Sequence, residues 1–571
     1  MLVCHATSLG AYDSISLHSS GIKKRFTFLS SSDSRIRVKD RKTVLFFEEG
    51  PDYTARSLLQ KFGDLDAILL KSGIGKYFAR LSLNFSTTIP TIDIERFQVA
   101  TIPDLQAPDG KDFTDGCGCI TRSAARRVAK ALGLQYVPSV FQFRYAGAKG
   151  VLVPHEPEDL EKWFPGHYEP GIELYLRPSQ IKYDAWLYTS LDISDHSKQR
   201  TVFKCAKLQR AMIRILTDQG VPLRNFKMLL RKELEHLVGV LKDRQKASDW
   251  LKRQETSLDA DDKSSQAMCL RMIAAGHDLS EPYLAQMLGR MLAKDILQLR
   301  RKLHIPVTNS IYLFGVCDES GVLQEDEIYC HAGTDGFIEG KVLMTRSPMM
   351  HPGDIRVVTA VKPPEDSPFY RHSDCVVLPI RGYQPLADKM GGGDLDGDQY
   401  FISWNEAIIP ETVDPPNPRE VSPPSTPLEA KVKKEKSARP AKTYDHMEEL
   451  RRYIGKRVLS FDIGATAKAW TEAANARELG SRDPYCLALS ARYECCLDTN
   501  KTGEEIPPIP PDALKGPLRT GTYAYITGDQ RRAFDNILYR PLPFRATGLD
   551  HPPRNAGSGM PLDVRSRRSH K

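Results

Sequence analysis

The hydrophobic period of the sequence changes twice, and this change limits the folds open to the chain. Between Val202 and Leu303, apolar residues recur at the spacing of helices. On both sides of this stretch, apolar and polar residues alternate as in β-strands, with glycine-rich turns between the runs. A chain of 571 residues is too long for one hydrophobic core. We therefore predict an α+β protein in which a helical connector joins two β-rich units.

The two β-rich units have similar sequence patterns. Because each unit is a series of short strands, the pair is expected to form two facing barrels with a cleft between them. The first unit contains predicted strands at 139–145 and from Val151 onward, separated by a turn at 146–150. The second unit contains predicted strands at 311–316, 340–346, 355–361, 374–379 and 400–404.

Three aspartates at alternate positions follow three glycines in residues 391–400. In an extended or tightly looped backbone, residues two apart point the same way, so Asp394, Asp396 and Asp398 converge. Two unit charges about 4 Å apart repel by roughly 4 kcal/mol at an effective dielectric of about 20, so the three need a cation or must take up protons. Oxygen ligands select a hard ion, Mg²⁺ or else Mn²⁺. We predict that these aspartates are both the catalytic residues and the metal ligands.

We call residues 391–398, with their three glycines and three aspartates, the acidic loop. Other interpretations of this loop fit the sequence less well. A calcium-binding EF-hand requires Gly and Glu where this chain has Gln399 and Asn405. A phosphohydrolase of the haloacid-dehalogenase type has D-x-D-G-T after a buried strand, and here Asp398 replaces the Thr. That phosphohydrolase stays an alternative, as does a solvated acidic turn without function.

Several cations could meet phosphates. Lys149 lies in a turn flanked by glycines, where its ammonium can reach a phosphate, although most turn lysines are simply solvated. Arg177 and Lys182 follow a predicted strand at 173–176 and add positive charge to the same unit. Arg346 ends a predicted strand of the second unit.

The overall composition permits a polyanionic partner without requiring one. The chain has 80 Lys and Arg against 72 Asp and Glu, a net charge of +8. Its eleven cysteines lack paired C-x-x-C spacing, which favours reduced thiols in an intracellular protein, nuclear or cytoplasmic. The sequence has neither a signal-peptide pattern nor 18 consecutive apolar residues, so we expect neither secretion nor a membrane span. No long heptad repeat indicates an oligomeric state.

Six sequence blocks occur together in a fixed order. They are NFSTT at 84–88, DGCG at 115–118, FQFRY at 141–145 with GAKG at 147–150, LRPS at 176–179, MTRSP at 344–348 with HPGD at 351–354, and DLDGD at 394–398. In these blocks the chain resembles the eukaryotic cell-encoded RNA-directed RNA polymerases of RNA silencing. The resemblance extends over about residues 75 to 503.

The resemblance implies a fold, an activity and a set of site residues. The fold would contain two double-psi β-barrels, the second supplying Asp394, Asp396 and Asp398 and the first supplying Lys149. The activity would be two-metal nucleotidyl transfer that makes double-stranded RNA from ribonucleoside triphosphates on a single-stranded RNA template. The resemblance implies that Lys149 faces the nucleotide and product phosphates. Arg346, Arg177 and Lys182 are further candidates for binding phosphates on the residues alone. RNA-silencing proteins are the expected partners.

The predicted organisation has seven parts. They are a partial domain at 1–108, the first barrel at 109–200, the connector at 201–305, the second barrel at 306–408, a Pro- and Lys-rich disordered linker at 409–442, a helical module at 443–515 and a tail at 516–571. Family members usually have a longer region before the first barrel. A non-catalytic RNA-binding scaffold therefore stays a second alternative.

Overall fold

A computed structural model shows the fold of the chain. The described residues all belong to one compact unit that extends to Arg519. The predicted linker beyond residue 417 and the predicted tail beyond residue 517 lie outside the described residues. The structure describes residues 2–6, 14–19, 22–32, 42–48, 50, 54–63, 65–185, 187–198, 205–254, 265–417, 449–450, 452–454, 462–502, 505–511 and 515–517.

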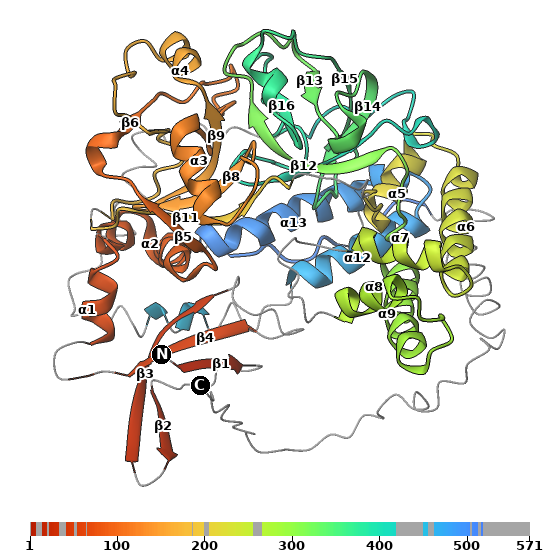
Figure 1. The fold of residues 1–571 in the computed structure, drawn as a ribbon, viewed down its shortest axis with the longest axis horizontal. Coiled ribbons are helices and arrows are strands. Elements are labelled where there is room, and N and C mark those ends of the chain that lie inside the picture. Colours follow the sequence, from red (N-terminus) through yellow and green to blue (C-terminus); the bar gives the residue numbers. More distant parts are fainter. Residues whose placement is uncertain are drawn as a thin grey trace. The chain divides into compact units, whose positions relative to one another are not determined.

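A four-stranded antiparallel sheet and two helices form the N-terminal part (Figure 1). The strand order is β1-β4-β3-β2. The Phe28 ring packs edge-on against Phe46, and α2 contributes buried Phe78 and Leu81 to the same core. The bounds are β1 Leu2–Ala6, β2 Ser14–Ser19, β3 Ile22–Ser32, β4 Lys42–Glu48, α1 Ala55–Gln60 and α2 Leu65–Leu81.

The first β unit is a seven-stranded sheet of order β5-β11-β8-β9-β7-β10-β6. The sheet begins at β5 and ends at β6, and these two edge strands do not pair with each other. The strand order is therefore open, whereas a closed barrel was predicted. Pro90 in β5 lacks an N–H for a further ladder, and β6 spans only Val99–Thr101. The remaining bounds are β5 Ile89–Asp93, β7 Cys117–Thr121, α3 Arg122–Ala131, β8 Phe141–Tyr145, β9 Ala148–His155, α4 Pro157–Trp163, β10 Leu174–Leu176 and β11 Ser190–His196.

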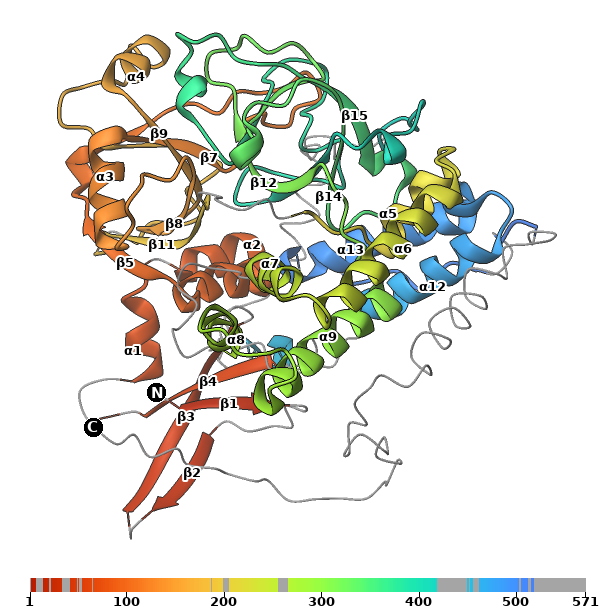
Figure 2. The ribbon, with the colours of Figure 1, turned by 45° about the vertical axis from the view of Figure 1, so that its right-hand side comes forward.

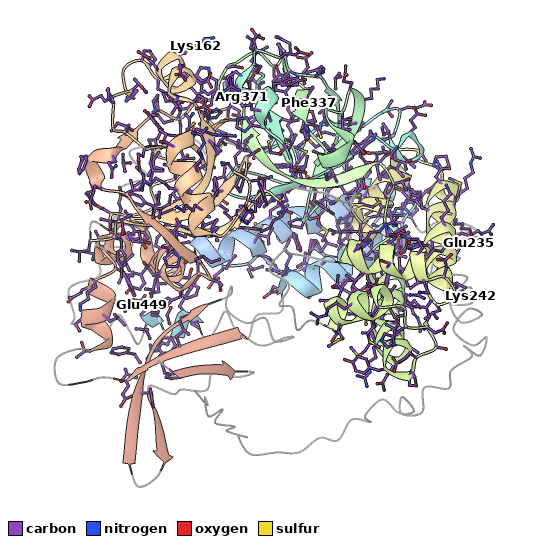
Figure 3. All side chains as sticks on the ribbon, viewed as in Figure 1. Lys162, Glu235, Lys242, Phe337, Arg371 and Glu449 are labelled. Atoms are coloured by element: carbon purple, nitrogen blue, oxygen red, sulfur yellow. The ribbon has the colours of Figure 1, made fainter. Side chains whose placement is uncertain are left out.

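In the described part of the connector, the helices α5 to α9 lie between the two β units, as the helical period predicts (Figure 2). Leu284, Leu288 and Leu292 of α9 are buried, whereas Glu235 and Lys242, labelled at the exposed side of the connector in Figure 3, meet solvent. None of the helices in the described ranges combines the length and apolar character needed to cross a membrane. The bounds are α5 Arg210–Asp218, α6 Leu223–Val240, α7 Arg244–Gln254, α8 Ser265–Ala274 and α9 Pro282–Lys302.

The second β unit is a closed six-stranded barrel, as predicted, of order β12-β16-β13-β15-β14-β17. β12 pairs in parallel with β16 and antiparallel with β17, and β14 closes the ring against β17. The barrel shares a hydrophobic core with Val151 and Val153 of the first unit, so the two units pack directly together (Figures 1 and 2). The bounds are β12 Ser310–Cys317, β13 Glu327–Cys330, β14 Gly340–Arg346, β15 Ile355–Ala360, β16 Cys375–Leu378 and β17 Gln399–Ser403.

The described part of the predicted C-terminal module includes the helices α12 and α13. α12 spans Asp462–Ala476 and α13 spans Pro484–Thr502. The two helices pack against each other, and α13 also packs against α2 of the N-terminal part. Arg492 of α13 donates to the Asp462 carboxylate at 2.7 Å, which ties the two helices at a polar contact.

Candidate active site

The acidic loop lies between β16 and β17, and hydrogen bonds join its residues to one another. The amide of Asp394 donates to Oδ2 of Asp398 at 3.1 Å, and the amide of Asp396 donates to Oδ1 of Asp394 at 3.2 Å. The Tyr400 hydroxyl donates to the Asp394 carbonyl at 2.9 Å. These contacts hold the three aspartates within one short turn. No strand lies between Leu378 and Asp394, which contradicts the phosphohydrolase alternative because that enzyme class needs a strand there.

The first β unit holds this loop from the other side. The amide of Leu395 donates to the Asp115 carbonyl at 2.8 Å, and Nε2 of Gln142 donates to the Asp396 carbonyl at 3.3 Å. Gly116 has φ +85°, and a Cβ there would lie 2.4 Å from Cβ of Asp396. The close approach of the two units therefore requires glycine at this position.

Lys149 and Arg346 bring positive charge to two of the carboxylates. The Lys149 ammonium, from the β8–β9 hairpin of the first unit, forms an ion pair with Oδ2 of Asp396. Arg346, at the end of β14, places Nε 2.5 Å from Oδ2 of Asp398. Its Nη1 also donates to the Gly391 carbonyl at 3.1 Å. The site thus combines cations from both units.

Asp394, the third carboxylate, differs from Asp396 in the direction of its pKa shift. Burial, together with the charges of Asp396 and Asp398, raises the pKa of Asp394 to about 8. Burial also opposes ionisation of Asp396, but Lys149, Lys182 and Arg144 together lower the pKa of Asp396. The raised pKa means that Asp394 favours its neutral form near pH 7, and that its ionised form needs a further positive charge nearby.

The donor set fits a hard divalent cation. All three side chains offer carboxylate oxygens, the ligands that hard divalent cations prefer. Burial and the charges of Asp396 and Asp398 disfavour the ionised form of Asp394, and a bound cation would favour it. Across the described part of the chain, no group of three or more His, Cys, Asp or Glu side chains is arranged to hold a metal ion. The reason at this loop is that Asp396 and Asp398 face Lys149 and Arg346. Asp394, Asp396 and Asp398 are the residues that would hold the ion.

The structure adds cations that the sequence did not single out as site residues. Arg144 and Arg80 both interact electrostatically with Asp396, and burial lowers the pKa of each guanidinium. Arg144 is one of the half-buried residues that alternate with fully buried ones along β8. No local sequence pattern distinguishes it from an ordinary arginine in a strand. Lys182, predicted as a phosphate ligand, also lies here: burial lowers the pKa of its ammonium, while Asp115 and Asp396 act in the opposite direction.

Arg177 does not belong to this group, which corrects the prediction that it binds phosphate. Its side chain is 1% exposed, and it forms an ion pair with Glu319. Its Nε donates to the Cys117 carbonyl at 2.8 Å. Because protein acceptors already bind its nitrogens, the guanidinium is not available to a phosphate.

A cavity of about 180 Å³ opens beside the acidic loop. Asp115 and Asp394 line it together with apolar Phe113, so residues of both units form its walls. Lys111 and Asp388, also in the lining, form an ion pair at 2.5 Å. The cavity reaches the site at Asp394, the one of the three carboxylates that forms no ion pair with a Lys or Arg of the described residues.

Comparison with known proteins assigns the chain to a family. A family model described as RNA dependent RNA polymerase matches residues 16–532. The chain belongs to this family. It is 29% identical over 508 residues to "Probable RNA-dependent RNA polymerase 2" of Oryza sativa subsp. japonica, a match covering 84% of this chain and 40% of that protein. It is 28% identical over 424 residues to "RNA-dependent RNA polymerase 1" of Schizosaccharomyces pombe, covering 70% and 33%.

A solved structure supports the fold. The chain resembles "RNA dependent RNA polymerase QDE-1 from Thielavia terrestris" with a TM-score of 0.68 and 22% sequence identity, over 90% of this chain and 62% of that one. "RNA-dependent RNA polymerase 2" of Arabidopsis thaliana is 29% identical over 520 residues, with 86% of this chain and 41% of the relative covered. The chain thus spans about two fifths of the length of the RNA-dependent RNA polymerase 2 proteins of Oryza sativa and Arabidopsis thaliana.

Proposed function

We propose that this chain catalyses template-directed nucleotidyl transfer, copying single-stranded RNA into double-stranded RNA from ribonucleoside triphosphates. The observation that carries the proposal is the ion pair between Lys149 of the first unit and Asp396 of the second. It brings a cation suited to phosphates and a carboxylate loop suited to a metal into one site. Membership of the polymerase family agrees with this chemistry.

In the proposed reaction, an RNA 3′-hydroxyl gives its proton to water, and its oxygen bonds to the α-phosphorus of a triphosphate as the bond to pyrophosphate breaks. Lys149 and Arg346 bind triphosphate oxygens, and Arg144 and Lys182 add positive charge beside Asp396. The Lys149 ammonium can also give a proton to the departing pyrophosphate. The carboxylates of the loop orient the reacting end. Mg²⁺ or Mn²⁺, when bound, supplies Lewis-acid stabilisation of the developing negative charge.

Further parts of the proposal rest on the resemblance of the sequence to the family. They are the double-psi topology of the two β units, the seven-part organisation of the chain, an intracellular location and a role with RNA-silencing proteins. The closed second barrel and the direct packing of the two units are consistent with that topology.

The main alternative is a non-catalytic scaffold that binds RNA. The experiment that separates the two supplies purified protein with a single-stranded RNA, Mg²⁺ and labelled nucleoside triphosphates. Template-dependent incorporation of label supports the polymerase. RNA binding without incorporation, at concentrations where the RNA is fully bound, supports the scaffold.

A further inference from the structure

A buried carboxylate lies directly behind the acidic loop. Asp354, at the turn between β14 and β15, is 2% exposed. Its Oδ2 accepts hydrogen bonds from the amides of Met350 and His351, each at 2.9 Å. Its Oδ1 accepts from the amide of Gly391 at 3.2 Å. One side chain therefore joins a turn of the barrel to the first glycine of the acidic loop.

Gly391 is held on its other sides as well. Its carbonyl accepts from Arg346, the residue that pairs with Asp398. Gly391 has φ +62°, and a Cβ there would lie 2.8 Å from the carbonyl oxygen of Pro348. The backbone at this point is thus in a conformation that side-chain-bearing residues rarely adopt, and its position depends on hydrogen bonds to neighbouring segments.

We propose that Asp354 is a positioning residue for the site, acting through Gly391 to set where the three carboxylates of the acidic loop lie. Asp354 itself does not meet substrate or metal. The role of the loop in catalysis rests on the proposed function. The hydrogen bond between Asp354 and the Gly391 amide, and its effect on the position of the loop, can be tested without that function. Gly391 begins the glycine run 391–393 that precedes the three aspartates, so the Asp354 carboxylate fixes the backbone at the start of this run.

Asp354→Asn tests the proposal because it removes one acceptor oxygen. The new NH₂ group is a donor and would face amide N–H groups, so at least one of the three hydrogen bonds is lost. Asp318→Asn is the matched control. Asp318 is 0% exposed in the same barrel and accepts from the amides of Ser320 at 3.1 Å and Leu323 at 2.8 Å. Among the described residues, the Asp318 side chain accepts hydrogen bonds from Ser320 and Leu323 and from no residue of the acidic loop.

The first readout is hydrogen exchange, followed by mass spectrometry of peptides covering residues 391–398. Asp354→Asn should raise deuterium uptake in these peptides, and Asp318→Asn should leave it at the wild-type level. Equal uptake in wild type and Asp354→Asn overturns the proposal. An equal rise in both variants also overturns it, because a general loss of barrel stability would then explain the change.

The second readout is binding of Mn²⁺, titrated by electron paramagnetic resonance. Loss of a partner that orients metal ligands typically weakens metal affinity by about 10–100-fold. We expect a weakening of this size in Asp354→Asn and none in Asp318→Asn. Unchanged Mn²⁺ affinity in Asp354→Asn overturns the proposal. Neither readout needs incorporation of nucleotides, so failure of the polymerase assay and failure of this inference are distinguishable.

If Asp354→Asn does not yield folded protein, Asp354→Glu replaces it in the exchange measurement. Glu keeps the charge and both acceptor oxygens, but its extra methylene shifts the carboxylate relative to the Gly391 amide in a buried site. Raised exchange over residues 391–398 supports the proposal. Wild-type exchange over these residues overturns it.

Discussion

Nη2 of Arg177 donates to both carboxylate oxygens of Glu319, each at 2.7 Å. The arginine follows β10 of the first unit, and the glutamate follows β12 of the barrel. The two side chains are 1% and 3% exposed, so this buried ion pair connects the two β units away from solvent. Because it fixes one unit against the other, it supports the contact between Lys149 and Asp396.

Arg177→Met should destabilise the protein strongly. The substitution leaves the Glu319 charge buried without its partner, which typically costs about 3–5 kcal/mol. The control is Arg127→Met, because Arg127 forms an exposed pair with Glu173, a kind of pair worth only about 0–1 kcal/mol. Urea unfolding measures both free energies of unfolding. A loss in Arg177→Met no larger than in the control would contradict the structural role.

Two buried histidines should make the protein less stable in acid. Burial, with the charges of His372 and Arg122, lowers the pKa of His155 well below its ordinary value. Burial, with Arg122 and Arg371, lowers the pKa of His372 to about 3. Neither ring nitrogen of His155 has a hydrogen-bond partner among the described residues. The folded state therefore favours both rings in their neutral form.

The sign follows from the lowered pKa values. Above about pH 6.5 both states hold neutral rings, and below it only the unfolded chain takes up the protons, so folding weakens by about 1.4 kcal/mol per pH unit for each histidine. For His372 the loss continues to about pH 3. Urea unfolding at pH 7.5 and 5.5 measures it. The double substitution His155→Phe and His372→Phe should reduce the difference in free energy of unfolding between the two pH values. A difference as large as in the wild type would show that other groups cause it.

Gly116→Ala should damage the site without changing its charges. The added Cβ would lie 2.4 Å from Cβ of Asp396, so the acidic loop must move away from the first unit. Gly133→Ala is the control, because Gly133 has a similar φ of +73° and its Cβ would meet nothing within 4 Å. Both variants should lose about 1 kcal/mol or more of stability from the positive φ.

Nucleotide incorporation should distinguish these two glycine variants. We expect a fall on the order of 100-fold in Gly116→Ala, the effect of misplacing reacting groups by about 1 Å. Gly133→Ala should retain near-wild-type incorporation. Equal activities in the two variants would mean that the contact between Gly116 and Asp396 does not position the loop.

Lys149→Gln should slow incorporation while leaving RNA binding near the wild-type level. Loss of one preorganised charge at a reacting phosphate typically lowers kcat by about 10²–10³-fold. Lys111→Gln is a suitable comparison, because Lys111 pairs with Asp388 at the cavity rather than with the three aspartates. Steady-state incorporation and RNA filter binding measure both effects. A loss confined to RNA affinity would place Lys149 outside the reacting centre.

Local sequence patterns indicated much of the fold but only part of the site. Helical spacing located the connector, and turn glycines pointed to Lys149 and to the acidic loop. The side chain of Arg177 was misread, because its sequence position shows a cation but not that Glu319 lies opposite it in the fold. Gln142 and Asp354 were missed for the same reason. Their partners are backbone groups of a loop far away in sequence, and such contacts leave no periodic signal.

The most direct test of the account is incorporation of labelled nucleotides by Asp396→Ala on a single-stranded RNA template. Asp396 contacts the first unit through Lys149 and belongs to the proposed metal ligands. We expect incorporation to fall to background while RNA binding and the circular dichroism spectrum stay at wild-type levels. Incorporation at the wild-type rate would contradict the claim that this loop is the centre of nucleotidyl transfer.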